Sequence, residues 1–225
     1  LFGLYKADSG TVKVNGEVVD LGRPKDAIDQ GIGMVHQHFQ LVPVLTVAEN
    51  IVLGKEPANR ANVIDIEEAK KKVKELAENY QLDVDTEATV EDLPVGTQQR
   101  VEILRSLYRK ADILILDEPT AVLTPQETDH LLQVLKNLAS QGVAIIFITH
   151  KLREVLEVAD EVTVMRNGQV VGSTTPSETD ESGLAEMMVG RSVVLRVAKE
   201  ESSPGETILK VNNLCVHDDR DLLAV

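Results

Sequence analysis

A run of four aliphatic residues that ends in two adjacent carboxylates, 113–116 followed by Asp117 and Glu118, constrains this chain most. Four aliphatic residues in succession suit a strand buried on both faces, the usual state of a central strand in a parallel sheet. The two carboxylates then lie at the carboxyl end of that strand, where open α/β sheets bind ligands. One carboxylate can coordinate a cation while the other orients a water molecule. The same residues also fit a plain buried strand that enters a charged loop.

Strand and helix patterns alternate around this run and predict a parallel core built from βαβ units. After the run, Thr124 and Glu127 occupy the N-cap and N3 positions of a capping box, with Pro125 at the first helical position. A second apolar strand, predicted over 143–149, ends at His150. The chain is therefore expected to be α/β.

Other regions of the chain have a different character. Residues 46–110 are expected to be mostly helical, with amphipathic helices over 66–80 and 96–109. Asn-Gly pairs at 15–16 and 167–168 are strong tight-turn signals between short apolar runs, and they predict two antiparallel hairpins.

Composition excludes several classes of protein. The net charge of −14 argues against a large nucleic-acid surface, and the basic cluster 70–72 is interleaved with glutamates as on a solvated helix face. A single cysteine, Cys215, rules out an internal disulfide and fits a reducing compartment. No apolar run approaches the roughly 20 residues that a membrane-spanning helix needs.

The organisation predicted from the sequence is one large domain and the start of another. We expect the first domain to cover 1–198, a polar linker with a Pro-Gly pair to cover 199–207, and a second domain to begin over 208–225. A strand is expected at 208–211. The chain does not begin with methionine, so we expect it to be a piece of a longer protein.

Three further features point to phosphate chemistry. The segment 93–100 begins a helix with Gly96 near its amino end, where free N–H groups and the helix dipole can hold phosphate. Gln37 is expected to end a strand over 33–37, and His150 ends the strand over 143–149. Each feature alone also fits an ordinary role: a capped helix, a polar strand end or a structural histidine.

In the order Gln37, 93–100, Asp117-Glu118 and His150, these features resemble the nucleotide-binding domain of ATP-binding cassette (ABC) proteins, over nearly the whole chain. The resemblance implies a P-loop NTPase-like (RecA-like) parallel-sheet core, with a helical subdomain and an antiparallel β portion. It also implies ATP and Mg²⁺ as cofactors and ATP hydrolysis as the activity.

The resemblance also implies roles for individual residues. Asp117 and Gln37 would hold Mg²⁺, Glu118 would polarise the attacking water, and His150 and Gln37 would arrange the γ-phosphate. The residues that match the ABC signature, here called the signature segment, would contact the nucleotide of an opposite cassette; they are Pro94, Val95, Gly96, Thr97 and Gln98.

Two local patterns, 149–152 and 187–191, look most like the tandem ATPases of simple-sugar and nucleoside importers. This likeness implies a peripheral protein at the cytoplasmic face of the plasma membrane that drives uptake of a simple sugar or nucleoside. The implied partners are membrane-spanning permease subunits, a second cassette in the same chain or a dimer and, indirectly, a solute-binding protein; nucleic acid is not among them. The alternatives are a soluble non-transport ABC ATPase, which needs a basic surface or long coiled coil, and a non-catalytic interaction module.

The sequence departs from the family pattern in three places. No Gly-x-x-x-x-Gly-Lys-Ser/Thr is present, so we expect the chain to be truncated just after this Walker A motif, without its amino-terminal strands and inactive alone. Pro94 stands where most signatures carry serine, which removes a hydroxyl donor. Thr124 replaces the usual D-loop aspartate and has a capping role instead.

Overall fold

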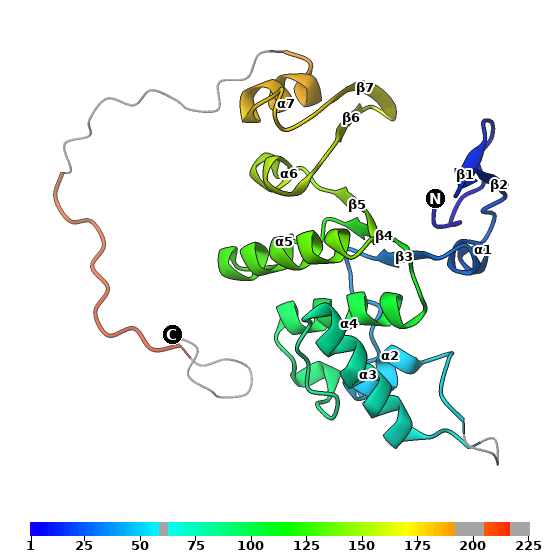
Figure 1. Ribbon diagram of the computed structural model, residues 1–225. Helices are drawn as coiled ribbons and strands as arrows, with labels where there is room; N and C mark the ends of the chain where they lie inside the picture. The colour runs from blue at the N-terminus through cyan, green and yellow to red at the C-terminus, as the bar shows by residue number, and fades with distance from the viewer. Residues whose placement is uncertain (59–62, 192–204, 217–225) are drawn as a thin grey trace. The chain divides into compact units, whose positions relative to one another are not determined.

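The structure, a computed structural model, describes residues 1–58, 63–191 and 205–216 (Figure 1). The chain divides into two compact units, Leu1–Ser192 and Val193–Val225, and the described helices and strands all belong to the first. In chain order they are β1 (Val12–Val14), β2 (Glu17–Val19), α1 (Pro24–Asp29), β3 (Ile32–Val35), α2 (Val47–Val52), α3 (Ile66–Tyr80), the 3-10 helix η1 (Val90–Asp92), α4 (Val95–Tyr108), β4 (Ile113–Asp117), α5 (Pro125–Ser140), β5 (Ala144–Ile148), α6 (Leu152–Val158), β6 (Val162–Arg166), β7 (Gln169–Thr174) and α7 (Glu181–Val189).

The sheet that positions the candidate site consists of β3, β4 and β5, which run parallel with β4 in the middle. Its register pairs Val35 of β3 with Leu116 of β4, and Asp117 of β4 with Ile148 of β5. The carboxyl ends of the three strands therefore meet at one edge of the sheet. The predicted parallel core is confirmed.

Strand β4 is buried on both faces, as its aliphatic run predicts. Leu114 and Leu116 are fully buried in a large apolar cluster with residues of α4 and α5, whereas Ile115 belongs to a second cluster with Ile32 and Ala27. Side chains that alternate along the strand thus anchor β4 to the layers on both sides. This double anchoring holds the end of β4 in place.

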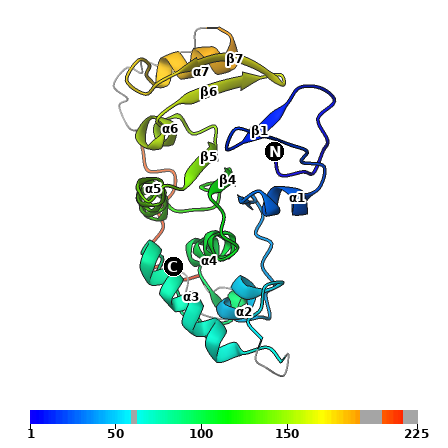
Figure 2. The same ribbon diagram turned by 45° about the vertical axis from the view of Figure 1, so that its right-hand side comes forward.

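The helical part of the chain follows β3. Helices α2, α3 and α4 pack against one another and lie together in both views (Figures 1 and 2). Thr46 and Glu49 form a capping box at the start of α2, and Asp65 caps α3. The buried side of α3 carries Ala69 and Val73 at a four-residue spacing. Because α4 also packs on β3, it joins the helical part to the sheet.

Two antiparallel hairpins complete the first unit. In β1–β2 the turn residues Asn15 and Gly16 have φ of 51° and 84°, and in β6–β7 Asn167 and Gly168 have φ of 51° and 75°. Positive φ at both turn positions is what a type I′ turn requires, and Asn-Gly supplies it at little steric cost. Both hairpins predicted from the Asn-Gly pairs are confirmed.

Three local predictions differ from the structure. Strands β3 and β5 end at Val35 and Ile148, so Gln37 and His150 each lie two residues into the following loop instead of ending a strand. Residues 208–211 form no strand, and Ile208 is fully exposed. A strand needs a neighbour to satisfy its backbone hydrogen bonds, and apolar alternation alone does not supply one. The expected domain boundary at 198 lies outside the described residues.

Among the described residues, no helix combines the length and the apolar composition needed to cross a membrane.

We expect the capping box of α5 to stabilise the first turn of that helix. Thr124 Oγ1 accepts the Glu127 N–H at 3.3 Å, and the Glu127 carboxylate accepts the Thr124 N–H at 2.9 Å. Replacing Thr124 with alanine should cost about 1 kcal/mol of local stability, or about fivefold faster amide exchange over the first turn. Hydrogen exchange of the full-length gene product measures this, with Thr163→Ala, an exposed threonine on β6, as control. Unchanged exchange in α5 would contradict it.

The same capping box should be sensitive to acid. The backbone N–H and hydroxyl of Thr124 hold the pKa of Glu127 below its usual value of 4.5. A carboxylate with a lowered pKa stabilises the folded state above its ordinary pKa, and this contribution disappears as the pH falls through the lowered value. The protection of the first turn of α5, measured against the intrinsic exchange rate of an unstructured peptide at the same pH, should therefore fall in that acidic range, and less so in the Thr124→Ala protein.

Candidate functional site

The centre of the candidate site is the end of β4. Asp117 is the last residue of the strand, and both Asp117 and Glu118 are partly exposed. Glu118 has φ of 45°, a left-handed conformation that non-glycine residues rarely adopt. Its N–H donates to the carbonyl of Ile148 at 2.9 Å, which ties the turn after β4 to the end of β5. The turn places both carboxylate residues at the edge where the strands end.

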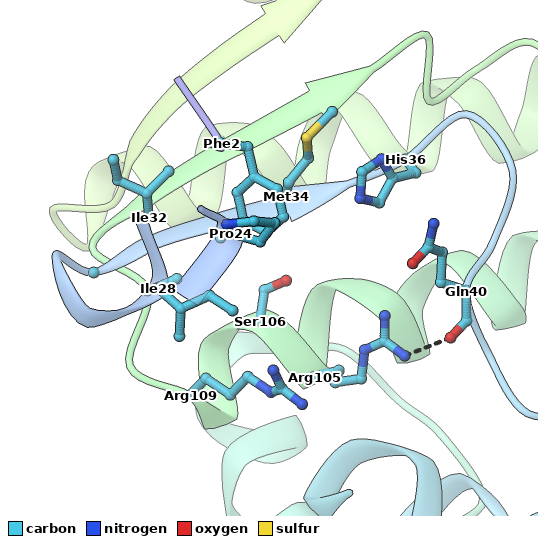
Figure 3. A pocket seen from close by; sticks show the side chains of 13 residues that line it. Phe2, Pro24, Ile28, Ile32, Met34, His36, Gln40, Arg105, Ser106 and Arg109 are labelled. Atoms are coloured by element: carbon cyan, nitrogen blue, oxygen red, sulfur yellow. Dashed lines mark hydrogen bonds between the residues drawn. The ribbon is translucent and has the colours of Figure 1, made fainter. Parts of the chain in front are cut away.

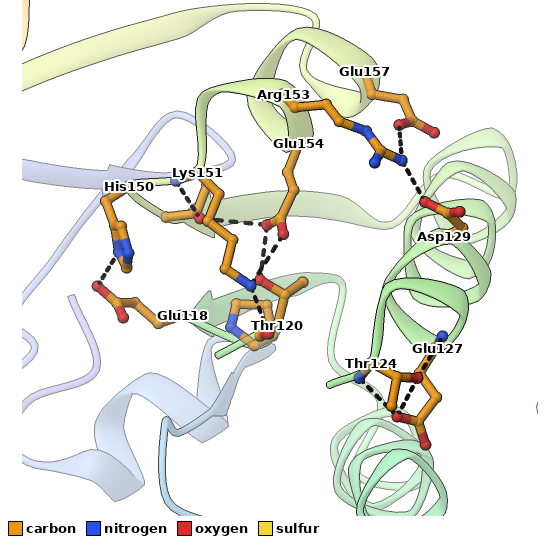
Figure 4. A network of polar contacts seen from close by, with 12 residues as sticks. Glu118, Thr120, Thr124, Glu127, Asp129, His150, Lys151, Arg153, Glu154 and Glu157 are labelled. Atoms are coloured by element: carbon orange, nitrogen blue, oxygen red, sulfur yellow. Dashed lines mark hydrogen bonds and ion pairs between the residues drawn. The ribbon is translucent and has the colours of Figure 1, made fainter. Parts of the chain in front are cut away.

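His150 contacts Glu118 directly. The Nδ1 atom of His150 lies 3.0 Å from Oε1 of Glu118 (Figure 4). The contact is possible because β4 and β5 are neighbours and their ends are in register. The side chain of His150 is 64% exposed and that of Glu118 is 32% exposed, so both can reach a ligand. The structure brings these two predicted residues together.

Gln37 lies at the same edge of the sheet but forms no side-chain hydrogen bond with Asp117 or Glu118 in the described part of the chain. Its loop is instead held through Gln40. The N–H of Gln40 donates to buried Glu102 of α4 at 2.6 Å, and its carbonyl accepts from Arg105 at 2.6 Å (Figure 3). Burial raises the pKa of the Glu102 carboxyl, while Arg105 acts in the opposite direction.

The signature segment begins α4. Pro94 is the N-cap residue and provides no side-chain cap, as its lack of a hydroxyl predicts. A Cβ at Gly96 would lie 2.6 Å from Oε1 of Glu127, so the Glu127 side chain would have to move to make room for it. Thr97 accepts from Arg100 at 3.0 Å, and Gln98 donates to the Leu93 carbonyl at 2.9 Å.

The signature segment makes no direct hydrogen bond to Asp117, Glu118 or His150 among the described residues. The link between them is indirect. Gln99, which follows the segment, is buried and donates to the carbonyl of Pro119 at 2.7 Å. Helix α4 is therefore fastened to the turn that carries Glu118.

Sequence reasoning missed the residues that hold the site's loops. Glu102 and Arg105 on α4 clasp the loop after β3, and Glu154 on α6 contacts Thr120 and Lys151 beside the candidate pair. Glu102 and Glu154 are buried carboxylates on helices, and in a sequence they look like ordinary surface residues. Only the burial of these positions distinguishes them.

A cavity of about 180 Å³ opens beside the Gln40 loop (Figure 3). One wall is formed by β3 and α1, and the other by Arg105 and Ser106 of α4 and by Arg109, the residue that follows the helix. Ile28 and Met34 give the cavity an apolar side, opposite the two guanidinium groups. The cavity thus lies between the sheet and the helical part of the chain.

The arrangement suits hydrolysis of a phosphate anhydride with Mg²⁺. In the described part of the chain the side chain of Asp117 has no hydrogen-bond or ion-pair partner, so its carboxylate oxygens are available to a hard cation. No group of three His, Cys, Asp or Glu side chains gathers there that could hold a metal by itself. Mg²⁺ commonly binds through one or two carboxylates together with substrate phosphates, which fits a single free carboxylate.

Several named proteins are similar in sequence to this chain along its entire length. The glucose import ATP-binding protein TsgD13 of Haloferax volcanii is 47% identical, and the nucleoside import ATP-binding protein NupA of Lactococcus lactis subsp. cremoris is also 47% identical. The guanosine import ATP-binding protein NupO of Bacillus subtilis is 48% identical. All three alignments cover 100% of this chain but only 46%, 44% and 44% of the relatives. The chain thus spans less than half the length of these proteins.

Solved structures share the fold. CbiO1 from Clostridium perfringens, part of the ABC transporter complex cbiONQ, is 27% identical with a TM-score of 0.65, over 78% of this chain and 70% of that one. MJ1267, an ATP-binding cassette of an ABC transporter in its ADP conformation, is 24% identical with a TM-score of 0.67, over 82% and 74%. The predicted P-loop NTPase-like α/β fold is confirmed.

A protein-family model for ABC transporters matches residues 1–121, which is more than half of the chain and includes the end of β4. The same region contains the signature segment and the loop that carries Gln37. The chain therefore belongs to the ABC transporter family, as an ATP-binding domain.

Proposed function

We propose that the full-length gene product is the ATP-hydrolysing subunit of an ABC importer that takes up a simple sugar or a nucleoside. The contact between Glu118 and His150 beside the free carboxylate of Asp117 carries this proposal. The solute class is supported by three relatives, which are named as ATP-binding proteins for the import of glucose, of nucleosides and of guanosine. Because this chain spans under half of those relatives, the activity is assigned to the full-length protein.

Each residue of the site has a part in this proposal. Asp117, with Gln37, would hold Mg²⁺, which supplies positive charge to the phosphate oxygens when it is bound. Glu118 orients the attacking water and accepts its proton. His150 faces Glu118 at 3.0 Å and donates to a terminal phosphate oxygen, where negative charge accumulates in the transition state.

The signature segment acts on a second cassette in this proposal. The first N–H groups of α4 and the helix dipole favour an anion, and 94–98 makes no direct hydrogen bond to the Glu118–His150 pair among the described residues. The segment would therefore complete the site of an opposite cassette when ATP closes the two together. Pro94 offers no hydroxyl, which weakens this contact by about 1–3 kcal/mol if the phosphate acceptor is left unpaired.

The permease is proposed to dock at the cavity beside the Gln40 loop. The cavity presents an apolar side at Ile28 and two guanidinium groups at Arg105 and Arg109, which fits an amphipathic segment with an acidic residue. Glu102 and Arg105 hydrogen-bond the backbone of Gln40, so the cavity lies beside the loop that carries Gln37. The protein would thus lie peripherally at the cytoplasmic face of the plasma membrane, with a solute-binding protein acting through the permease.

Replacing Glu118 with glutamine should abolish steady-state hydrolysis in the full-length protein. The amide keeps the size of the side chain but cannot accept the proton of the attacking water, so kcat should fall by about 10²-fold or more. ATP binding should remain, since Asp117 is untouched. The measurement is Mg²⁺-dependent phosphate release together with nucleotide binding.

Asp112→Asn is the matched control for Glu118→Gln, because Asp112 is an exposed carboxylate next to the amino end of the same strand. This variant should hydrolyse ATP at the wild-type rate. Hydrolysis by Glu118→Gln at the rate of the control, or no Mg²⁺-dependent hydrolysis in the wild-type protein, would refute the proposed function.

Replacing Ile28 with glutamate should separate the ATPase from its permease. A carboxylate in the apolar side of the cavity has to be desolvated when a partner covers it, so association should weaken about tenfold or more. Co-purification with the permease and solute uptake should fall, while hydrolysis by the isolated protein should persist. Val18→Glu, at an exposed apolar residue of β2, is the control. Equal uptake by the two variants would place the docking surface elsewhere.

A further inference from the structure

The contacts of Glu154 join the two loops that carry the candidate catalytic pair. Glu154 lies in the first turn of α6, and only 5% of the residue is exposed. Its Oε2 atom accepts from Thr120 Oγ1 at 2.8 Å and from Thr149 Oγ1 at 3.4 Å (Figure 4). Its Oε1 atom lies 3.4 Å from Nζ of Lys151. One buried carboxylate therefore contacts both loops.

The partners of Glu154 lie next to both members of the Glu118–His150 pair in the sequence. Thr120 follows Glu118 by two residues, and Thr149 and Lys151 flank His150 on either side. Lys151 adds a second link, because its Nζ donates to the carbonyl of Thr120 at 2.7 Å. The loops after β4 and β5 are thus tied together beside the Glu118–His150 contact and not through it.

These ties act on a strained turn. Glu118 has φ of 45°, and a non-glycine residue keeps such a conformation only when its surroundings enforce it. The N–H of Glu118 bonded to Ile148 is one restraint, and the Thr120 hydroxyl bonded to Glu154 is another. A buried carboxylate with several donors has one favourable arrangement, so it restrains its partners more closely than an exposed ion pair does.

We propose that Glu154 is a positioning residue that sets the contact between His150 and Glu118 by holding Thr120, Thr149 and Lys151. This inference rests on the proposed ATPase function for its kinetic consequences, but the contact itself can be measured without hydrolysis. Glu154 touches neither member of the pair directly among the described contacts, so it acts through the two loops.

The full-length protein with Glu154→Gln tests this inference. The amide retains an acceptor for Thr120 but loses the charge that Lys151 faces, so both loops should relax. We expect kcat for Mg²⁺-dependent hydrolysis to fall about tenfold or more while KM for ATP stays within about twofold, because a misplaced catalytic group mainly affects the chemical step. Thr120→Val removes the hydroxyl that donates to Glu154 and should lower kcat in the same way. This variant replaces Glu154→Gln in the test if Glu154→Gln does not fold.

Glu157→Gln is the matched control. Glu157 is an exposed carboxylate on the same helix, with ion pairs to Arg153 and Lys136, and among the described contacts it has none with Thr120, Thr149 or Lys151. Its substitution should leave kcat within about twofold of the wild-type value, as expected for exposed ion pairs.

A spectroscopic measurement separates positioning from general stability. With labelled histidine, the ring resonance of His150 should shift when Glu118 is replaced by glutamine, because the two side chains touch. In the Glu154→Gln or Thr120→Val background, the same replacement should shift it less than half as much, a non-additivity expected of coupled residues.

An undiminished shift in both backgrounds overturns the inference, and so does a folded Glu154→Gln or Thr120→Val protein with kcat within twofold of wild type. Absence of hydrolysis in the wild-type protein would instead refute the proposed function, and the His150 shift would then decide this inference alone.

Discussion

The parallel register of β3, β4 and β5 is the constraint on which the rest of the structure depends. Because Val35 pairs with Leu116 and Asp117 pairs with Ile148, all three strands deliver their carboxyl ends to one edge. Strand β4 is held in the middle by apolar packing on both faces, so its last residue cannot shift without disturbing two clusters. The candidate chemistry lies at the end of the central strand of the sheet.

Buried carboxylates then fix the loops that leave this edge. Glu102 of α4 accepts from the backbone of the loop after β3, and Glu154 of α6 accepts from residues of the loops after β4 and β5. A carboxylate taken out of water needs several hydrogen-bond donors. The backbone N–H groups of helices and strands are already paired within those elements, whereas loops have unpaired N–H and hydroxyl groups to offer. The hydrogen bonds that these buried carboxylates accept therefore hold the loops in place, although loops are otherwise the more mobile parts of a protein.

Helix α4 connects most parts of the site. Its amino end is the signature segment, Gln99 reaches the Pro119 carbonyl next to Glu118, and Glu102 with Arg105 clasps Gln40 near the cavity. A single helix thus carries the signature segment, the contact to the Pro119 carbonyl and the contacts to Gln40. Such a connection is what a protein needs if docking of a permease is to influence ATP chemistry.

The sequence by itself determined much of the local structure: the buried strand before Asp117-Glu118, the capping box of α5 and the Asn-Gly hairpins depend on residues close together along the chain. It also put Glu118 and His150 after two neighbouring strands, and hence at one edge. It misplaced Gln37 and His150 by two residues each and assigned a strand to 208–211, because strand ends depend on a pairing partner. Only the tertiary structure decided that Glu118 and His150 touch and that Glu102 and Glu154 are buried. Burial and contact between distant residues arise from how the layers pack, and no local pattern of side chains encodes them.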